Sequence, residues 1–446
     1  MTDNKIIELT PFRVSILRSL ARRGERLLVS PDLAEEVADL EPLEAYYIIR
    51  EIGLDLALPI MLELSPEQLE ACVDLDCWNR YDFAADNLDE WLTVFAQDSP
   101  ESLAQAFSSL DYVVQLLFLT KLVTVYDPDT DQVPADDDEN DPNRAMTPDG
   151  FFLLELKNEV ALRTHPFALL DALYQYDPGA AHQLLSDIRV DLQIQIEEEA
   201  LRFRNGRMED LGFSGPDEAA VLFSRPNVRQ PLPPMAEPLE IAPTRMPSVY
   251  AGPLGEISLL EQALSRVTDR EELSRLEQEI VWAINGAIIA YGEKTQEIKL
   301  IADIAERVRD TISLGLEVLL NQAEPECPPQ GAAAVVKAAA LLAVWNVTDL
   351  FRHGFAATLG LQQEVRQALA DPGFSAWFNL PDTGQAEGQE ERLARAFVNA
   401  LRGRHPLRGG FDPGKVEKVL AFASLAEIKV AQLRLQRLVA GISAGD

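Results

Sequence analysis

A helix-opening pattern that begins with Ser-Pro recurs three times in the first third of the chain. The three stretches read VSPDLAEEVADLE, LSPEQLEACVDLD and DSPESLAQAFSSLD, and their Ser-Pro pairs start at Ser30, Ser65 and Ser99. Ser is a favourable N-cap, Pro at the first helical position has no amide hydrogen to leave unpaired, and the acidic residue that follows suits the positive end of the helix dipole. The pattern predicts three helix starts at a period of about 35 residues.

Each repeat continues into a second apolar segment. The continuations LEPLEAYYIIREIG, LDCWNRYDFAADNLDEWLTVF and LDYVVQLLFLTKLVTVY carry apolar residues three and four positions apart, which is typical of helices with one buried face. Two helices per repeat at this period are typical of an α-solenoid, in which stacked hairpins bury faces that one hairpin cannot cover alone. Such a stack offers a concave surface for a partner, or serves as a plain helical framework, and the sequence leaves both open.

The charge of the chain restricts the classes of partner. Its formal net charge is −34, and 47% of its residues are hydrophobic, so it can bury a sizeable core beneath a strongly acidic surface. An acidic surface repels phosphate backbones and anionic lipids. We therefore expect no nucleic-acid binding.

The same composition bears on localisation. The amino terminus lacks the order of a signal peptide, and the apolar windows 280–291 and 332–345 are shorter than the about 20 residues that span a bilayer. The three cysteines are too few for a disulfide framework and fit reduced thiols. The sequence predicts a cytoplasmic protein without membrane insertion.

Residues 126–142 read YDPDTDQVPADDDENDP and contain no Lys or Arg. A calcium loop takes oxygen ligands at alternating early positions, glycine at the sixth and a bidentate Glu at the twelfth. Counted from Asp127, three carboxylates fall at ligand positions, but Gln132 and Asp138 replace the glycine and the glutamate. A solvated acidic loop is the prediction, with weak cation binding as the alternative. The candidate cation ligands are Asp127, Asp129, Asp131 and Asp138.

The region that follows is predicted to extend the first domain with helices. In TPDGFFLLEL a Pro-Asp-Gly turn precedes an apolar run, and the sequence allows one small β element here, near 147–156. A long helix is predicted to end near Asn205-Gly206. The arginines at its end are a candidate anion site or, alternatively, pair with flanking carboxylates such as Glu209 and Asp210. These arginines are Arg202, Arg204 and Arg207.

Frequent prolines between residues 225 and 256 exclude helix interiors and predict a semi-rigid connector. Beyond it, long amphipathic segments predict a helical bundle. Within the bundle, RGRHPLRGG is a second candidate anion site or a solvated turn whose arginines pair with carboxylates; these are Arg402, Arg404 and Arg408. The predicted domains are a repeat region at 1–126, the acidic loop at 127–146, a helical extension at 147–224, the connector at 225–256 and the bundle at 257–446.

Recognisable catalytic motifs are missing from the sequence. GAIIAYGEKT is similar to a phosphate-binding loop, but its glycines are one residue too far apart and Glu293 precedes Lys294. No HExxH pair, GxSxG elbow or Cys-His arrangement is present. We therefore predict no catalytic residues, no metal ligands and no cofactor.

Several stretches resemble known families. The capped hairpins LSPEQLEACVDL and DSPESLAQAFSSL resemble short helical units in the cytoplasmic amino-terminal domain of bacterial magnesium transporters and in the flagellar motor switch protein. Over nearly the whole chain, TPDGFFLLEL, RFRNGRMEDLGF and LFRHGFAATLGL are similar to an uncharacterised bacterial family of acidic, largely helical proteins. The second resemblance implies a helical fold and supplies no catalytic residues.

The fold prediction is an all-α protein in which a short α-solenoid of helical hairpins precedes a helical bundle. The predicted function is a non-enzymatic cytoplasmic scaffold or regulatory adaptor that binds another, unidentified protein through a helical surface; self-association stays open. One alternative is an enzyme with carboxylate and arginine chemistry in the carboxy-terminal bundle. The other is a regulator that responds to divalent cations through the acidic loop.

Overall fold

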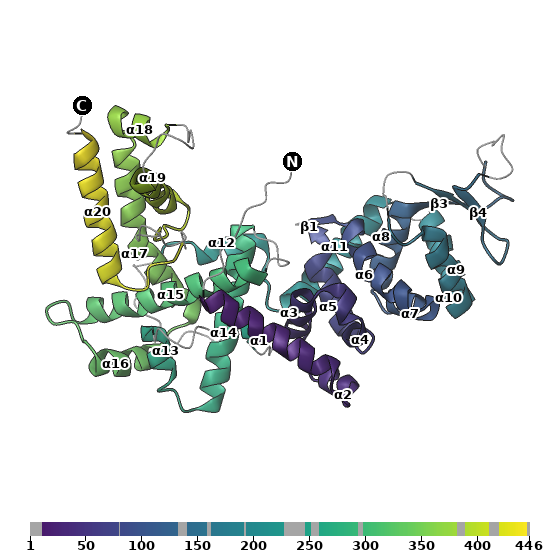
Figure 1. The fold of residues 1–446 in the computed structure, drawn as a ribbon, viewed down its shortest axis with the longest axis horizontal. Coiled ribbons are helices and arrows are strands. Elements are labelled where there is room, and N and C mark those ends of the chain that lie inside the picture. Colours follow the sequence, from purple (N-terminus) through teal and green to yellow (C-terminus); the bar gives the residue numbers. More distant parts are fainter. Residues whose placement is uncertain are drawn as a thin grey trace. The chain divides into compact units, whose positions relative to one another are not determined.

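The computed structural model describes residues 11–79, 81–132, 141–157, 162–190, 193–226, 246–250, 258–292, 298–380, 389–409 and 419–443. The chain divides into two compact units (Figure 1). The amino-terminal unit comprises Ile16–Leu211 and Lys294–Ile298. The carboxy-terminal unit comprises Gly212–Glu293 and Lys299–Asp446, together with Met1–Ser15.

The predicted, mostly helical fold is confirmed for the described residues, which form twenty α-helices and a few short strands. The first helices are α1 (Pro11–Leu28), α2 (Leu33–Ala38), α3 (Pro42–Ile52), α4 (Leu54–Met61), α5 (Pro66–Asp76), α6 (Ala85–Asp98), α7 (Pro100–Ser108), α8 (Tyr112–Leu122), α9 (Pro166–Tyr176), α10 (Pro178–Val190) and α11 (Gln193–Asp210). Those that follow are α12 (Pro216–Leu222), α13 (Leu259–Leu264), α14 (Arg270–Tyr291), α15 (Ile298–Ala323), α16 (Ala332–Leu342), α17 (Val347–Ala368), α18 (Pro372–Phe378), α19 (Gln389–Arg402) and α20 (Leu425–Ser443), with a short 3-10 turn at Ser248–Tyr250. Among the described helices, none alone has the length and apolar character needed to cross a membrane; the pair α7 and α8 has them jointly but is bent by 119°.

Two of the three Ser-Pro pairs cap helices as predicted. Ser65 Oγ accepts a hydrogen bond from the Gln68 amide at 3.2 Å, and the Gln68 side chain accepts one from the Ser65 amide at 2.9 Å, which completes a capping box at the start of α5. Ser99 accepts from the Ser102 amide at 3.0 Å and caps α7. At Ser30 the prediction is wrong: the hydroxyl accepts from the amide of Asp32, and α2 begins only at Leu33, after a turn.

Helices of successive repeats pack side by side in the amino-terminal unit. α3 contacts α5, α4 contacts α6, and α6 contacts α7, while α9 packs on α7 and α11 packs along α8 and α5. Large aromatic side chains fill the layer between them, and Tyr46, Tyr47, Trp91, Phe107 and Phe118 are fully buried. Tyr46, Tyr47, Trp91 and Phe118 lie in the second halves of the repeats, where apolar spacing predicted a buried face, whereas Phe107 lies in a first half.

A small antiparallel sheet joins this unit where the sequence allowed a β element. β5 (Leu153–Leu156) pairs with β3 (Val123–Tyr126) on one side and with β4 (Arg144–Met146) on the other. The strand order is β3-β5-β4. The sheet lies against α10 through β3 (Figure 1). The acidic loop thus connects two strands of one sheet. A second, two-residue pairing of β1 (Trp78–Asn79) with β2 (Asp82–Phe83) was not predicted.

The carboxy-terminal unit begins ahead of the predicted connector. Residues 212–224, which the sequence analysis placed in the first domain, belong to this unit, because α12 packs against α14 and α17 and buries Phe213, Leu222 and Phe223. Of the connector 225–256, only 225–226 and 246–250 lie within the described residues. There Tyr250 is buried, and its hydroxyl donates to Asn285 Oδ1 of α14 at 2.5 Å.

Four helices at the end of the chain surround one apolar core. α17 contacts α19 and α20, and α18 contacts α20 (Figure 1). The buried side chains of this core include Leu361, Phe374, Phe397 and Leu435 of these helices, and Phe422 from the segment before α20. This cluster confirms that the carboxy-terminal segments pack as helices around a common interior.

Two glycines set the distance between α15 and α17. A Cβ on Gly315 would collide with the carbonyl oxygen of Leu350, and a Cβ on Gly354 would collide with that of Thr311. The two backbones therefore lie in direct contact, an approach that any side chain at either position would prevent. Gly360, also in α17, has open space around the corresponding position.

We predict that Gly354→Ala lowers the free energy of unfolding by about 3 kcal/mol, because the added methyl must separate two packed backbones. Gly360→Ala is the matched control and should raise it by up to about 1 kcal/mol, the helix-propensity gain of Ala over Gly. Urea denaturation of both variants measures the difference. Equal stabilities for the two variants would contradict the contact.

Candidate functional site

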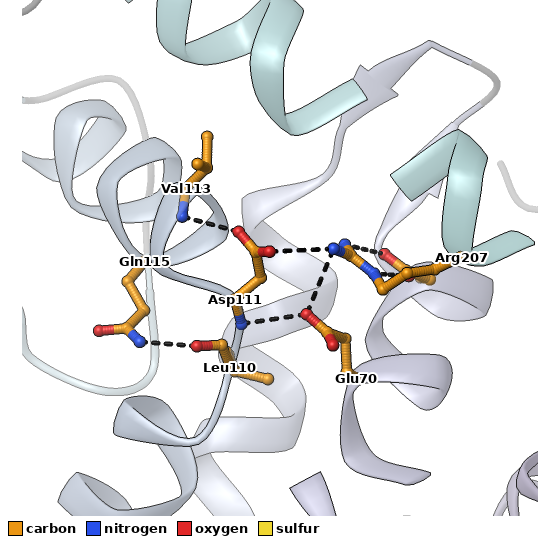
Figure 2. A network of polar contacts seen from close by, with 7 residues as sticks. Glu70, Leu110, Asp111, Val113, Gln115 and Arg207 are labelled. Carbon is orange, nitrogen blue, oxygen red and sulfur yellow. Dashed lines mark hydrogen bonds and ion pairs between the residues drawn. The ribbon is translucent and has the colours of Figure 1, made fainter. Parts of the chain in front are cut away.

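Arg207 on α11 contacts three carboxylates from the repeat helices (Figure 2). Its guanidinium binds Asp74 through two bonds, Nε to Oδ2 at 2.6 Å and Nη2 to Oδ1 at 3.0 Å. Nη1 donates to Asp111 Oδ2 at 3.1 Å and lies 3.4 Å from Glu70 Oε1. Glu70 and Asp74 lie on α5, and Asp111 is the N-cap of α8, so one side chain joins three helices.

Burial makes this pairing necessary. The side chain of Asp74 has 0% exposure, and burial raises its pKa against the opposing hydrogen bonds from Arg207. Burial also lowers the pKa of Arg207, but the hydrogen bond to Asp74 and the charges of Asp74, Glu70 and Asp111 outweigh it, so that the pKa is raised. Arg207 therefore remains charged and neutralises a carboxylate that has no access to water.

Further hydrogen bonds hold the carboxylates in place. The amide of Asp111 donates to Glu70 Oε1 at 3.1 Å, and Asp111 Oδ1 accepts from the Val113 amide at 2.8 Å, which caps α8 (Figure 2). The side chain of Gln115 donates to the Leu110 carbonyl at 2.7 Å. The turn before α8 is thereby tied to α5 as well as to Arg207.

A second buried carboxylate lies two residues further along α5. Asp76 accepts hydrogen bonds from the Tyr46 hydroxyl of α3 at 3.1 Å and from Trp91 Nε1 of α6 at 2.7 Å. The Tyr46 bond is to Oδ1 and the Trp91 bond is to Oδ2, and Arg50 Nη1 lies 3.5 Å from the same Oδ2. Asp74 and Asp76 were missed in the sequence analysis, although two acids within the apolar helix LEACVDLD signal buried polar partners.

α11 continues past the predicted end at Asn205-Gly206 to Asp210, and its three arginines predicted as an anion site do not form one cluster. Arg204 Nε donates to the backbone carbonyl of Asp74 at 3.1 Å, and its guanidinium lies over the Trp78 ring. Arg202 is exposed and lies over Phe203. Arg207 does pair with carboxylates, which was the alternative prediction. Its partners, however, belong to the repeat helices and are not the flanking Glu209 and Asp210.

The described part of the acidic loop is held by an arginine. Arg189 on α10 donates to Asp131 Oδ2 at 2.7 Å and lies 3.7 Å from Asp127 Oδ2. The hydrogen bond from Arg189 lowers the pKa of Asp131 to about 2. Asp129 is exposed, and Asp138 lies outside the described residues. Two of the predicted cation ligands thus already share a cation, the guanidinium of Arg189.

The arginines of RGRHPLRGG also separate. Arg408 forms an ion pair with Glu427, whereas Arg402 and Arg404 are exposed and lie over the rings of Phe378 and Phe223. Within the described residues, neither Arg402 nor Arg404 forms an ion pair. The interpretation as a turn paired with carboxylates therefore fits Arg408 alone.

Between these arginines, His405 is buried in the carboxy-terminal unit. Tyr291 Oη and His405 Nδ1 are hydrogen-bonded at 2.5 Å. Nε2 lies 3.4 Å from Thr311 Oγ1, which donates to the Arg307 carbonyl at 2.7 Å. Burial, followed by the charge of Arg307, lowers the pKa of His405 to about 3. The imidazole is neutral at ordinary pH and links α14 and α15.

Metal-binding geometry is not found among the described residues, where no group of three or more His, Cys, Asp or Glu side chains could hold an ion. Cys72 and Cys77 are buried, and burial raises the pKa of each thiol, as expected for unreactive core cysteines.

Comparison with protein-family models places the chain in a family. The model of a family of unknown function (DUF6178) matches residues 7–441, which is nearly the whole chain. No curated protein and no solved structure matches the chain. The similarity of the capped hairpins to magnesium transporters and to the flagellar motor switch protein therefore remains a resemblance of short segments.

We predict that Arg207→Met lowers the free energy of unfolding by about 3 kcal/mol, because it leaves buried Asp74 without its partner. Arg202→Met, on the exposed face of the same helix, is the control and should change stability by less than about 0.5 kcal/mol. Adding Asp74→Asn to Arg207→Met should recover part of the loss. Urea denaturation of the three variants tests the pairing, which fails if both single arginine variants are equally stable.

We also predict that His405 contributes to acid sensitivity. Its pKa lies near 3 in the folded protein and about 6.5 in the unfolded chain, so below about pH 6.5 only the unfolded chain gains the proton. Stability is therefore lost as the pH falls, by about 2 kcal/mol between about pH 6.5 and about pH 5. His405→Gln should remove this part of the pH dependence in urea denaturation, and an unchanged slope would refute the assignment.

Proposed function

We propose that the chain, which belongs to the DUF6178 family, is a non-enzymatic cytoplasmic scaffold or regulatory adaptor whose amino-terminal unit binds another protein. The observation that carries the proposal is an exposed apolar stripe along α4 and its C-cap residue Leu62. Leu56 is 68% exposed and Leu62 is 42% exposed, with the exposed Pro59 between them. The opposite face of α4 buries Ala57, Ile60 and Met61.

Carboxylates border this stripe. Asp55 and Glu63 are exposed beside Leu56 and Leu62. The neighbouring helix α2, which contacts α4, exposes Glu35 and Glu36. An apolar stripe with an acidic border favours an amphipathic helix or peptide with basic flanks, because the apolar contacts supply affinity and the charges select the partner.

A buried network that joins the helices against which α4 packs supports a preformed surface. α4 packs against α3 and α6, and Asp76 joins those two helices through Tyr46 and Trp91. A surface that is already ordered loses less conformational entropy on binding than a flexible one. The polar network at Asp76 therefore favours binding at α4 without contacting the partner.

Affinity purification of the tagged full-length protein from its native host tests the proposal. We expect one protein to be recovered in stoichiometric amount by the unmodified chain, and to be lost with the double substitution Leu56→Glu and Leu62→Glu. Ile194→Glu is the control, because Ile194 is 69% exposed on α11 of the same unit. Thermal melts establish that the variants fold.

The interaction is then measured with the purified partner by calorimetry. Rising salt should weaken it, because the acidic border contributes attraction that salt screens. Recovery of no partner, or equal recovery with both variants, would overturn the proposal.

A further inference from the structure

α20 has two apolar faces. The inner face packs into the core of the carboxy-terminal unit and comprises Ile428, Ala431, Leu435, Leu438 and Ile442. The outer face is exposed and comprises Ala426, Val430, Leu433, Arg437 and Ala440. Both sets advance along the helix by alternate steps of three and four residues, which is the spacing of a helix-pairing seam. The inner seam has its partners, and the outer seam is exposed.

The outer seam has the composition of a helix contact. Val430 is 59% exposed and Leu433 is 54% exposed, in the centre of the exposed face. A β-branched residue followed three positions later by Leu corresponds to the a and d positions of a heptad. Small residues, Ala426 and Ala440, lie at the two ends and allow another helix to approach closely.

The charges along this face are basic, although the chain as a whole carries −34. Lys429 flanks the seam, and Arg437 lies within it; both are exposed. The only carboxylate of α20, Glu427, is in an ion pair with Arg408. A helix that pairs with this seam meets positive charge that α20 itself does not neutralise.

We propose that the outer seam of α20 binds an acidic amphipathic helix of a partner protein. Leu or Ile side chains of that helix would cover Val430 and Leu433, and its Glu or Asp side chains would pair with Lys429 and Arg437. Charges beside a helix seam set partner choice and orientation, whereas the apolar contacts supply most of the affinity. This surface is distinct from the α4 stripe and takes a partner of opposite charge.

The charge pattern disfavours a second copy of the same helix. In a parallel pair, Arg437 would face Arg437 of the second copy, and Lys429 would face Arg434. Like charges at these positions oppose pairing. An acidic helix replaces each repulsion with an attraction.

The test uses the full-length protein and a labelled synthetic helix of about three heptads, with Leu at a and d and Glu at e and g. A second peptide with Lys in place of Glu is the comparison. Fluorescence anisotropy should show saturable binding of the acidic peptide. The net negative charge of the protein would by itself favour the basic peptide. Preferential binding of the acidic peptide would therefore be due to the local positive charge on α20.

Two variants locate the site. The double substitution Lys429→Glu and Arg437→Glu should weaken binding of the acidic peptide at least roughly tenfold. Both positions are exposed, so the fold should tolerate the substitutions. Val336→Glu is the control, since Val336 is 57% exposed on α16 of the same unit, and it should leave binding unchanged. Thermal melts compare the folded state of each variant.

Three results would overturn the proposal: no saturable binding of the acidic peptide, equal binding by the charge-reversed variant, or a dimer of the unmodified chain that Val430→Glu dissociates. The last result would assign the seam to self-association. None of these results depends on α4, so the two proposals can fail separately.

Discussion

The architecture of the amino-terminal unit depends on two carboxylates buried in one helix. Asp74 and Asp76 both lie on α5, with 0% and 1% exposure, and a buried charge without a partner costs several kcal/mol. Asp74 is neutralised by Arg207 of α11, and Asp76 is bonded by side chains of α3 and α6. These polar bonds therefore connect α5 to α3, α6 and α11 inside the unit.

The fold was largely predictable because its signals are local. Cap residues and helical spacing depend only on near neighbours, which is why Ser65 and Ser99 cap their helices as predicted. Ser30 also precedes a proline and a helix-like apolar pattern, but its hydroxyl accepts a hydrogen bond from the Asp32 amide within a turn. The apolar spacing is the same whether the serine caps a helix or lies in a turn. The partner of Arg207 was not predictable, because Asp74 lies 133 residues away and only the folded chain brings them together. The same holds for Arg189 and the acidic loop, where the sequence showed the carboxylates and not their cation.

The candidate sites show how a strongly acidic chain uses its basic residues. Arg189, Arg207 and Arg408 each form ion pairs with carboxylates of the same chain. Their charges are therefore used for contacts inside the fold. Lys429 and Arg437 differ, because they border an exposed apolar seam whose own carboxylate is already paired. The α4 stripe has the reverse arrangement, with carboxylates at its border. The two surfaces proposed for binding therefore favour partners of opposite charge.

The two units are also stabilised by different means, with a consequence for the binding proposed at α20. The amino-terminal unit relies on buried ion pairs, which constrain which helices meet. The carboxy-terminal unit relies on backbone contact at Gly315 and Gly354 and on a neutral imidazole at His405. Acid therefore acts on the second unit through His405, because the unfolded chain gains a proton that the buried imidazole excludes. His405 contacts Phe351 and Phe355 of α17, and α17 packs against α20, so a loss of packing there weakens the support of α20. Binding at α20 should consequently weaken in mild acid as the packing of the carboxy-terminal unit is lost.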